Sequence, residues 1–173
     1  FDLSTYGKII GGGMPLSAVV GRADLLELAS DKHPDRVWFN GGTFSAHALT
    51  MLAGMTLIEH LRAHEPEIYP ALEARMARLR AGIEEAFARH GILARCTRDG
   101  SDGFPAGSLS VPYFPTDQGQ CDVTLKEKAL KLGLLLEGVN VAHGLGAISL
   151  AHDDADIDRS IAAYEAFARR LRA

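Results

Sequence analysis

The spacing of apolar residues along the chain predicts three long helices. Between residues 46 and 63, apolar side chains occur around most of the circumference of a helix that Ser45 can cap, as is typical of a core or a subunit interface. A second helix starts at Pro66 and ends at Gly91. The last helix follows Asp153 or Asp154.

The second and the last helix each carry one apolar stripe, which recurs every three or four residues and should face a core. In the second helix the stripe consists of Ile68, Leu72, Met76, Leu79, Ile83 and Phe87. In the last helix it consists of Ile157, Ile161, Tyr164, Ala168 and Leu171.

Shorter patterns predict the remaining elements. Residues 16–21 form an apolar run closed by glycine, which indicates a buried strand in a sheet covered on both faces. Residues 22–30 indicate a short helix, and residues 31–42 are rich in Pro, Asp, Asn and Gly and indicate a loop.

After Gly91, short strands alternate with a helix. Thr124 and Glu127 form a capping box for a helix that reaches Glu137 and stops at Gly138. The predicted strands cover residues 92–97, 108–113, 139–142 and 147–151, and a turn-rich segment covers 98–107.

These elements divide the chain into three parts. Residues 91–173 should form a small α+β domain, and residues 66–90 the helix that leads to it. Residues 1–65 offer one convincing strand and two helices, which is too little sheet to bury so apolar a helix. We therefore interpret them as the end of a larger, incomplete domain.

Composition and charge narrow the class of protein. The 173 residues are 47% hydrophobic, which is ordinary for a globular protein. The 18 basic and 22 acidic residues give no excess of positive charge that would favour binding to nucleic acid. Cys96 and Cys121 form no metal-binding or disulfide pattern, which favours a cytoplasmic protein. No apolar run approaches the ~20 residues of a membrane span, so we expect no membrane partner.

One lysine stands apart from the other four. Lys8 lies between glycines and isoleucines, whereas Lys32, Lys126, Lys128 and Lys131 occupy polar surroundings. An apolar, backbone-crowded setting disfavours the charged ammonium, and this is how a lysine becomes a nucleophile that forms a Schiff base with a carbonyl. The sequence therefore predicts an activated amine at Lys8.

The glycines beside Lys8 do not complete a nucleotide-binding motif. Asp2 and Ile9 occupy positions where a phosphate-binding loop needs Gly and Ser or Thr, and Leu16 stands where a dinucleotide fingerprint needs its third glycine. Taken alone, residues 11–13 could equally be a tight turn of any fold.

The segment from Asp2 to Arg22, with Gly-Lys-Ile-Ile-Gly-Gly-Gly-Met-Pro followed by Ala-Val-Val-Gly-Arg, resembles the lysine region of the class III pyridoxal-phosphate aminotransferases. Within that class it is most similar to the glutamate-1-semialdehyde aminomutase group. The resemblance continues through residues 42–45, 149–152 and 156–159, and thus spans the chain in order.

This resemblance implies an α/β protein of fold-type I, in which the chain holds the end of the large parallel-sheet domain and the small C-terminal α+β domain. It implies pyridoxal 5'-phosphate (PLP) as cofactor, with pyridoxamine 5'-phosphate formed in the cycle, and small-molecule amino and carbonyl substrates. Lys8 would form the Schiff base with PLP and then move a proton between substrate and cofactor.

By the same resemblance, Thr43 and the backbone of Gly42 contact the cofactor phosphate of the neighbouring subunit, which implies a homodimer. The alternative for Thr43 is a helix-capping hydroxyl. We interpret His47, His143 and His152 as packed or capping histidines, and expect no metal site.

Three departures from the family pattern bear on the reaction. His47-Ala48 replaces a usual Asn-Pro, and the segment at residues 142–148 is shortened. Both lie where substrate specificity would be set. The chain also begins after the family's phosphate-binding turn, ring-stacking aromatic and pyridine-pairing aspartate, so it should lack a complete cofactor site.

Three hypotheses follow. The first is an aminotransferase of this group, including relatives that act on β-amino acids. The second is a true glutamate-1-semialdehyde 2,1-aminomutase. The third, from another class, is a non-catalytic interaction module that keeps the fold without the site.

Overall fold

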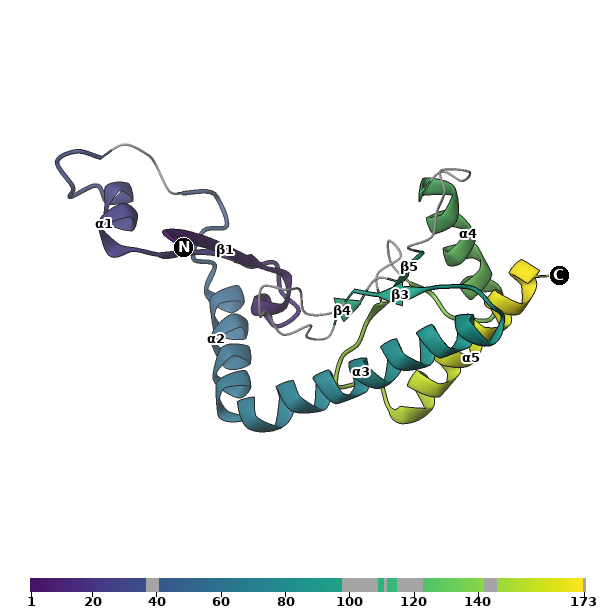
Figure 1. The fold of residues 1–173 in the computed structure, drawn as a ribbon. Helices are drawn as coiled ribbons and strands as arrows, with labels where there is room; N and C mark the ends of the chain where they lie inside the picture. Colours follow the sequence, from purple (N-terminus) through teal and green to yellow (C-terminus); the bar gives the residue numbers. More distant parts are fainter. Residues whose placement is uncertain (37–40, 98–108, 111, 115–122, 142–145, 173) are drawn as a thin grey trace. The chain divides into compact units, whose positions relative to one another are not determined.

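The computed structural model describes residues 1–36, 41–97, 109–110, 112–114, 123–141 and 146–172 (Figure 1). These residues form two compact units, Phe1–Glu65 and Pro66–Ala173. All three sheets in the described residues are antiparallel and two-stranded. The assignment of the two units to a large and a small domain stays a prediction.

The first unit begins with a β-hairpin. Strand β1 (Leu3–Gly7) pairs with β2 (Ser17–Gly21) in a register that joins Leu3 to Gly21 and Gly7 to Ser17. The 3₁₀ turn η1 (Lys8–Gly11) follows β1 directly. After β2 come α1 (Ala23–Leu26) and the 3₁₀ turn η2 (Glu27–Ala29), which together confirm the predicted short helix.

The hairpin corrects one prediction. Residues 16–21 were expected to form a strand buried on both faces, but most of β2 is exposed, including Val19 and Val20. The reason is that, among the described residues, β2 pairs only with β1 and no segment covers most of its side chains. The described residues 31–36 form no helix or strand, as expected for the loop, and residues 37–40 lie outside the described part.

Helix α2 (Ala48–Ala63) starts later than predicted, and Ser45 is not its cap. Its N-cap is His47, whose Nδ1 accepts a hydrogen bond from the Thr50 backbone N–H at 3.5 Å. The Ser45 N–H instead donates to the Gly42 carbonyl in a turn that precedes the helix. His47 is thus a capping histidine, as the sequence indicated.

The described residues of the second unit form three helices and four short strands. Their bounds are α3 (Glu65–Arg89), β3 (Arg95–Cys96), β4 (Leu109–Ser110), β5 (Pro112–Tyr113), α4 (Val123–Leu136), β6 (Gly146–Ala147) and α5 (Asp154–Arg172). β3 pairs with β5, and β4 pairs with β6.

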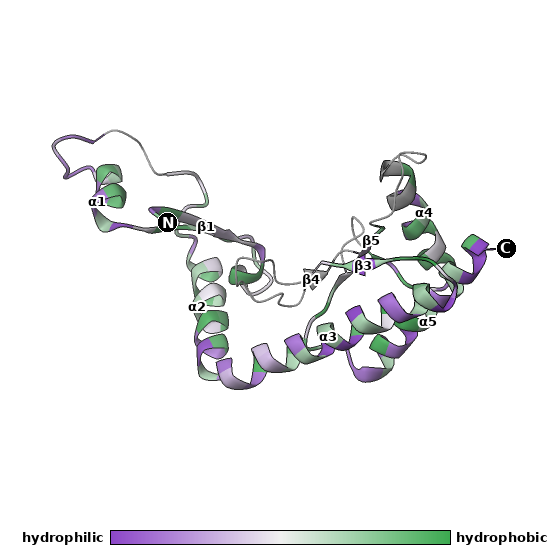
Figure 2. Ribbon diagram, viewed as in Figure 1, coloured by the Kyte–Doolittle hydropathy of each residue, from purple (hydrophilic) through white to green (hydrophobic). Residues whose placement is uncertain are grey.

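The hydrophobic core of this unit forms where the predicted apolar stripes meet. Met76, Ile83, Phe87, Leu134 and Ile157 are its largest fully buried side chains. The ring of Phe87 makes edge-on contacts with Phe114, Tyr164 and Phe167, with ring centroids 5.3 to 6.4 Å apart. Figure 2 shows the corresponding green stripes on α3 and α5. Leu171, at the end of the α5 stripe, is exposed.

Several predicted element boundaries need correction. The strand predicted at 92–97 is limited to Arg95–Cys96, and the described residues of 108–113 include β4 and β5. Residues 139–141 form no strand, and of the strand predicted at 147–151 only Ala147 lies in one. α4 begins one residue before Thr124, while the side chains of Thr124 and Glu127 lie outside the described part. Residues 98–107, Ala142 and His143 lie outside it as well.

Asp153 caps α5, as predicted, in a reciprocal capping box. The Asp156 N–H donates to Asp153 Oδ1 at 2.9 Å, and the Asp153 N–H donates to Asp156 Oδ2 at 3.1 Å. Arg78 of α3 forms ion pairs with Asp154 at 3.3 Å and with Asp158 at 2.5 Å. These contacts join α5 to α3.

The first unit differs from the second in having no hydrophobic core. Among the described residues of 1–65, no large apolar side chain is buried, and only Gly11, Thr50 and Gly54 are. Five apolar side chains of α2 are exposed by 41% to 61%: Leu49, Met51, Leu52, Met55 and Ile58. Figure 2 shows green over most of α2. No helix in the described residues is long and apolar enough to cross a membrane.

Candidate functional site

Lys8 stands at the point where β1 ends and η1 begins. Its φ is +55°, in the left-handed region that non-glycine residues rarely adopt. Its side chain is exposed, and within the described part of the chain it has no hydrogen-bond or ion-pair partner. The ε-amine is therefore free to meet a carbonyl compound.

The surroundings of Lys8 differ from those the sequence suggested. We expected an apolar, crowded setting, but Lys8 is exposed and Ile9 beside it is 75% exposed. The neighbouring glycines bring no side chains that could cover the amine, and the described part of this chain supplies no layer above it. The exposure of Lys8 corrects the expected burial of this residue, and the role expected for Lys8 stays a prediction.

Thr43 and Gly42 lie in the turn before α2, at the edge of a hollow of about 710 Å³ in the first unit. Thr5 and Tyr6 of β1 line the same hollow, together with His47 and Thr50 of the α2 amino end. Thr43 is exposed, and among the described residues its hydroxyl has no partner. Since His47 is the N-cap, the helix-capping alternative for Thr43 is wrong.

Gly42 and Thr43, which are adjacent in the sequence, both line this hollow, but Lys8 does not. Ala46, in the same turn as Thr43, has a φ of +53°. Lys8 and Ala46 are the two non-glycine residues of the described chain with positive φ. The sequence analysis missed Ala46, because nothing in the residue type signals a left-handed backbone.

Arg22 closes the open end of the hairpin. It forms ion pairs with Asp2 at 3.0 Å and with Asp24 at 2.6 Å, and its N–H donates to the Asp2 carbonyl. The hydrogen bond from Arg22 holds the pKa of Asp24 below its usual range. The charges at this end pair with each other, which leaves Lys8 as the unpaired cation of the hairpin among the described residues.

Comparison with known proteins shows which proteins the chain is similar to. No protein-family model matches the chain. It is 36% identical to the glutamate-1-semialdehyde 2,1-aminomutase of Desulforudis audaxviator (strain MP104C), over 95% of this chain and 37% of that protein. Among solved structures, it is similar to a β-phenylalanine aminotransferase from Variovorax paradoxus (32% identity, TM-score 0.74, 96% of this chain and 38% of the other).

A second solved structure is the PLP form of the FumI protein of Sphingopyxis sp. MTA144 (28% identity, TM-score 0.75, 99% of this chain and 37% of the other). The chain is homologous to the class III transaminases. The likeness also confirms the predicted fold-type I, and the mixed helices and strands are consistent with a carboxyl-terminal portion. This transaminase homologue spans about two fifths of the length of the relatives it matches.

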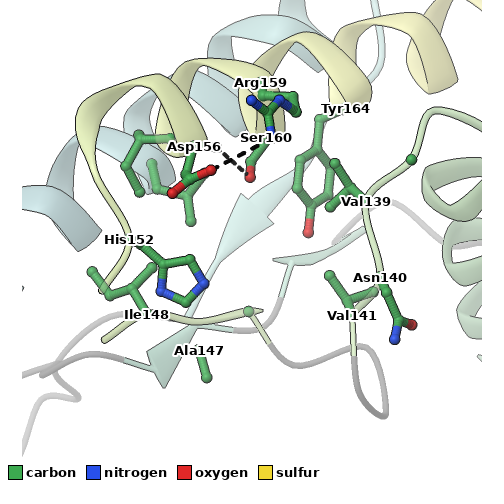
Figure 3. Close-up of a pocket in the computed structure, with 14 residues that line it drawn as sticks. Val139, Asn140, Val141, Ala147, Ile148, His152, Asp156, Arg159, Ser160 and Tyr164 are labelled. Atoms are coloured by element: carbon green, nitrogen blue, oxygen red, sulfur yellow. Dashed lines mark hydrogen bonds and ion pairs between the residues drawn. The ribbon is translucent and has the colours of Figure 1, made fainter. Parts of the chain in front are cut away.

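The second unit of the transaminase homologue contains another pocket, of about 360 Å³ (Figure 3). Val139, Val141 and Ile148 form part of its apolar wall, and the Tyr164 phenol points into it. Burial, with a smaller contribution from Cys96, raises the pKa of Tyr164, so the phenol stays protonated. Sequence reasoning had placed Tyr164 only in the core stripe.

Three further polar or charged side chains at this pocket, His152, Ser160 and Asp156, already have partners. His152 Nδ1 accepts from the Ser149 N–H at 3.0 Å, so His152, which is exposed, bonds within the turn before α5 and is neither packed in the core nor the helix cap. Ser160 Oγ donates to the Asp156 carbonyl at 2.8 Å, and Arg159 pairs with Asp156 at 3.5 Å (Figure 3). In the described residues, no group of three His, Cys, Asp or Glu could hold a metal ion.

Proposed function

We propose that this chain is the carboxyl-terminal portion of a PLP-dependent enzyme that transfers amino groups, with Lys8 as the residue that binds the cofactor covalently. One observation carries the proposal. In a homologue of PLP-dependent enzymes, a lysine with a free, exposed amine is held on a left-handed backbone at the end of a strand. Such costly conformations gather at functional sites.

The residues present fit PLP. Lys8 offers an unpaired primary amine. Thr43 offers a free hydroxyl and Gly42 an exposed backbone, both just before the amino end of α2. When bound, PLP supplies the electron sink for chemistry at the substrate's amine-bearing carbon. The positive end of the α2 dipole favours a phosphate near Thr43.

Lys8 then has two tasks. Its Nζ would hold the cofactor covalently through the cofactor's carbonyl group, with water as the leaving group. As a free amine, the same Nζ would act as general base and then as general acid, taking up a proton from the amine-bearing carbon of the substrate and giving it back at a second carbon. The exposed, unpaired state of Lys8 suits both tasks, since no ion pair has to be broken first.

We also propose that Thr43 serves the cofactor of a neighbouring subunit, so that the enzyme works as a homodimer. In support, Thr43 and Gly42 line a hollow to which Lys8 does not contribute, as expected if the two act in different active sites.

The test uses the product of the complete open reading frame that encodes this chain. The protein is incubated with PLP and reduced with borohydride, which adds hydride across the carbon–nitrogen double bond and makes the link stable to digestion. We expect mass spectrometry to find the pyridoxyl phosphate group on the tryptic peptide that contains Lys8 and ends at Arg22.

Lys32 provides the matched control, because it is an exposed lysine of the same unit. A Lys32→Ala protein should retain labelling and activity, whereas Lys8→Ala should lose both, with amino transfer reduced more than about 10²-fold. A wild-type protein that labels Lys8 no better than Lys32 would contradict the proposal and favour a non-catalytic module.

A true glutamate-1-semialdehyde 2,1-aminomutase is the second candidate, favoured by the name of the curated relative that is 36% identical. A mutase moves an amino group within one molecule, whereas an aminotransferase needs a separate carbonyl acceptor. Turnover of glutamate-1-semialdehyde in the absence of any keto acid would establish the mutase. Absence of turnover until a keto acid is added would establish the aminotransferase.

A further inference from the structure

We propose that Gly12 and Gly54 are positioning residues that hold the Lys8 turn against helix α2. We call this pair the glycine seat. The inference rests on the proposed function, because the role proposed for Lys8 requires that its amine is presented from a fixed direction. The glycine seat would fix this direction.

Gly12 brings the turn into contact with the backbone of α2. A Cβ added at Gly12 would lie 2.8 Å from the Ala53 carbonyl oxygen and 3.2 Å from the Ala53 carbonyl carbon. Helix backbone cannot retreat without losing its own hydrogen bonds, so a side chain at this position would push the turn away. The φ of Gly12, +59°, adds a second reason for glycine.

Gly54 is the matching position on the helix. A Cβ there would lie 2.5 Å from Leu16 Cδ2 and 3.0 Å from the Ile10 carbonyl oxygen. Gly54 is buried within α2, where alanine would form the better helix. Helical preference therefore argues against glycine at this position, and close packing of the turn argues for it.

The seat acts on Lys8 through a short, hydrogen-bonded stretch of backbone. Gly12 N–H donates to the Ile9 carbonyl at 3.1 Å, and Met14 N–H donates to the Gly11 carbonyl at 3.0 Å. η1, which starts at Lys8, is thus fixed by β1 at one end and by α2 at the other. A left-handed φ at Lys8 persists only if its surroundings impose it, and the seat supplies this constraint.

The experiment compares variants of the complete protein by borohydride labelling with PLP, scored as the ratio of pyridoxyl phosphate on Lys8 to that on Lys32. We expect Gly54→Ala and Gly12→Ala to lower this ratio about tenfold or more, since small misplacements of reacting groups are costly. In the cofactor-free protein, hydrogen exchange of the backbone amides of residues 9–14 and of Leu16 should become faster in both variants.

Two controls separate positioning from general damage. Gly13 has a φ of +88°, further from the left-handed minimum than Gly12, yet a Cβ there would meet nothing within 4 Å among the described residues. Gly13→Ala therefore adds backbone strain without contact and should leave the labelling ratio unchanged. Leu16→Ala removes the Cδ2 atom that a methyl group at position 54 would meet, so Leu16→Ala combined with Gly54→Ala should restore labelling toward the wild-type ratio.

Each outcome decides one question. If wild-type Lys8 is not labelled above Lys32, the proposed function fails and the seat loses its purpose with it. If wild-type Lys8 is labelled and Gly54→Ala retains the same ratio, the seat is wrong while the proposed function stands. If Gly13→Ala lowers the ratio as much as Gly12→Ala does, strain rather than contact is responsible and the inference is overturned.

Discussion

At the scale of single residues, backbone strain marks the candidate site. Lys8 and Ala46 hold left-handed φ values without being glycine, at an expected cost of about 1–3 kcal/mol each. One is the proposed cofactor-binding lysine and the other shares a turn with Thr43. Elsewhere in the described chain, residues with positive φ are glycines.

The buried phenol of Tyr164 predicts a pH dependence of stability. Tyr164 is 2% exposed, and its pKa in the folded protein lies above its ordinary value. Below the unfolded pKa near 10, both states are protonated and the contribution of Tyr164 to stability is complete. As pH rises further, the unfolded state loses its proton first, so the free energy of unfolding falls.

We therefore expect Tyr164→Phe to make the loss of stability above about pH 10 shallower in urea titrations at a series of pH values. Tyr69→Phe, at an exposed tyrosine of the same unit, should leave the slope as in the wild type. Equal slopes in the wild type and Tyr164→Phe would refute the assignment.

Single residues also show what the sequence could and could not predict. The contrast between Lys8 and four lysines in polar surroundings was readable from residue types alone, and Lys32, Lys128 and Lys131 are indeed exposed. The exposure of Lys8 could not be predicted from residue types, because burial depends on which distant segments cover a turn. Nor were the positive φ of Ala46 and the closeness of Gly54 to Leu16, since both arise from tertiary packing.

At the scale of elements, long helices were predictable and short strands were not. α3 and α5 carry enough turns for their apolar period to be recognised, and their stripes meet in the core. β3 to β6 have two residues each, too few for any alternation to appear. β1 was missed although Thr5 and Tyr6 favour strands, because its partner was assigned to a buried sheet.

The capping box of α5 predicts a measurable loss. Asp153→Ala removes the acceptor for the Asp156 N–H, and we expect a decrease of about 0.5–2 kcal/mol in the free energy of unfolding. Asp153→Asn keeps a side-chain oxygen and should cost much less. Urea denaturation followed by circular dichroism measures both, and an equal loss for Ala and Asn would show that charge rather than capping is involved.

At the scale of the whole molecule, the two units differ in how they are stabilised. Sixteen buried residues form the core in the described part of the second unit, whereas the described part of the first has no large buried apolar side chain. The exposed face of α2 is therefore an apolar surface whose contact with water is unfavourable. Each large side chain on it would gain about 1.5–3 kcal/mol from burial.

We expect the 173-residue chain alone to self-associate through α2. Leu52→Glu and Met55→Glu, which place charges on this face, should shift the chain toward monomer in light scattering at equal concentration. Glu59→Gln, at an exposed polar position of the same helix, serves as the control and should not. A wild-type chain that is already monomeric at high concentration would disprove the expectation.

The hairpin that carries Lys8 finally limits how this region can evolve. Its register joins Gly7 to Ser17, so the connecting loop has nine residues, 8–16. Adding or removing one of them would change the number of residues between Gly12 and β1 or β2, and would move Gly12 away from Ala53. Among descendants of this sequence, changes of residue type at Ile9 or Pro15 should therefore accumulate, while the length of the loop stays constant.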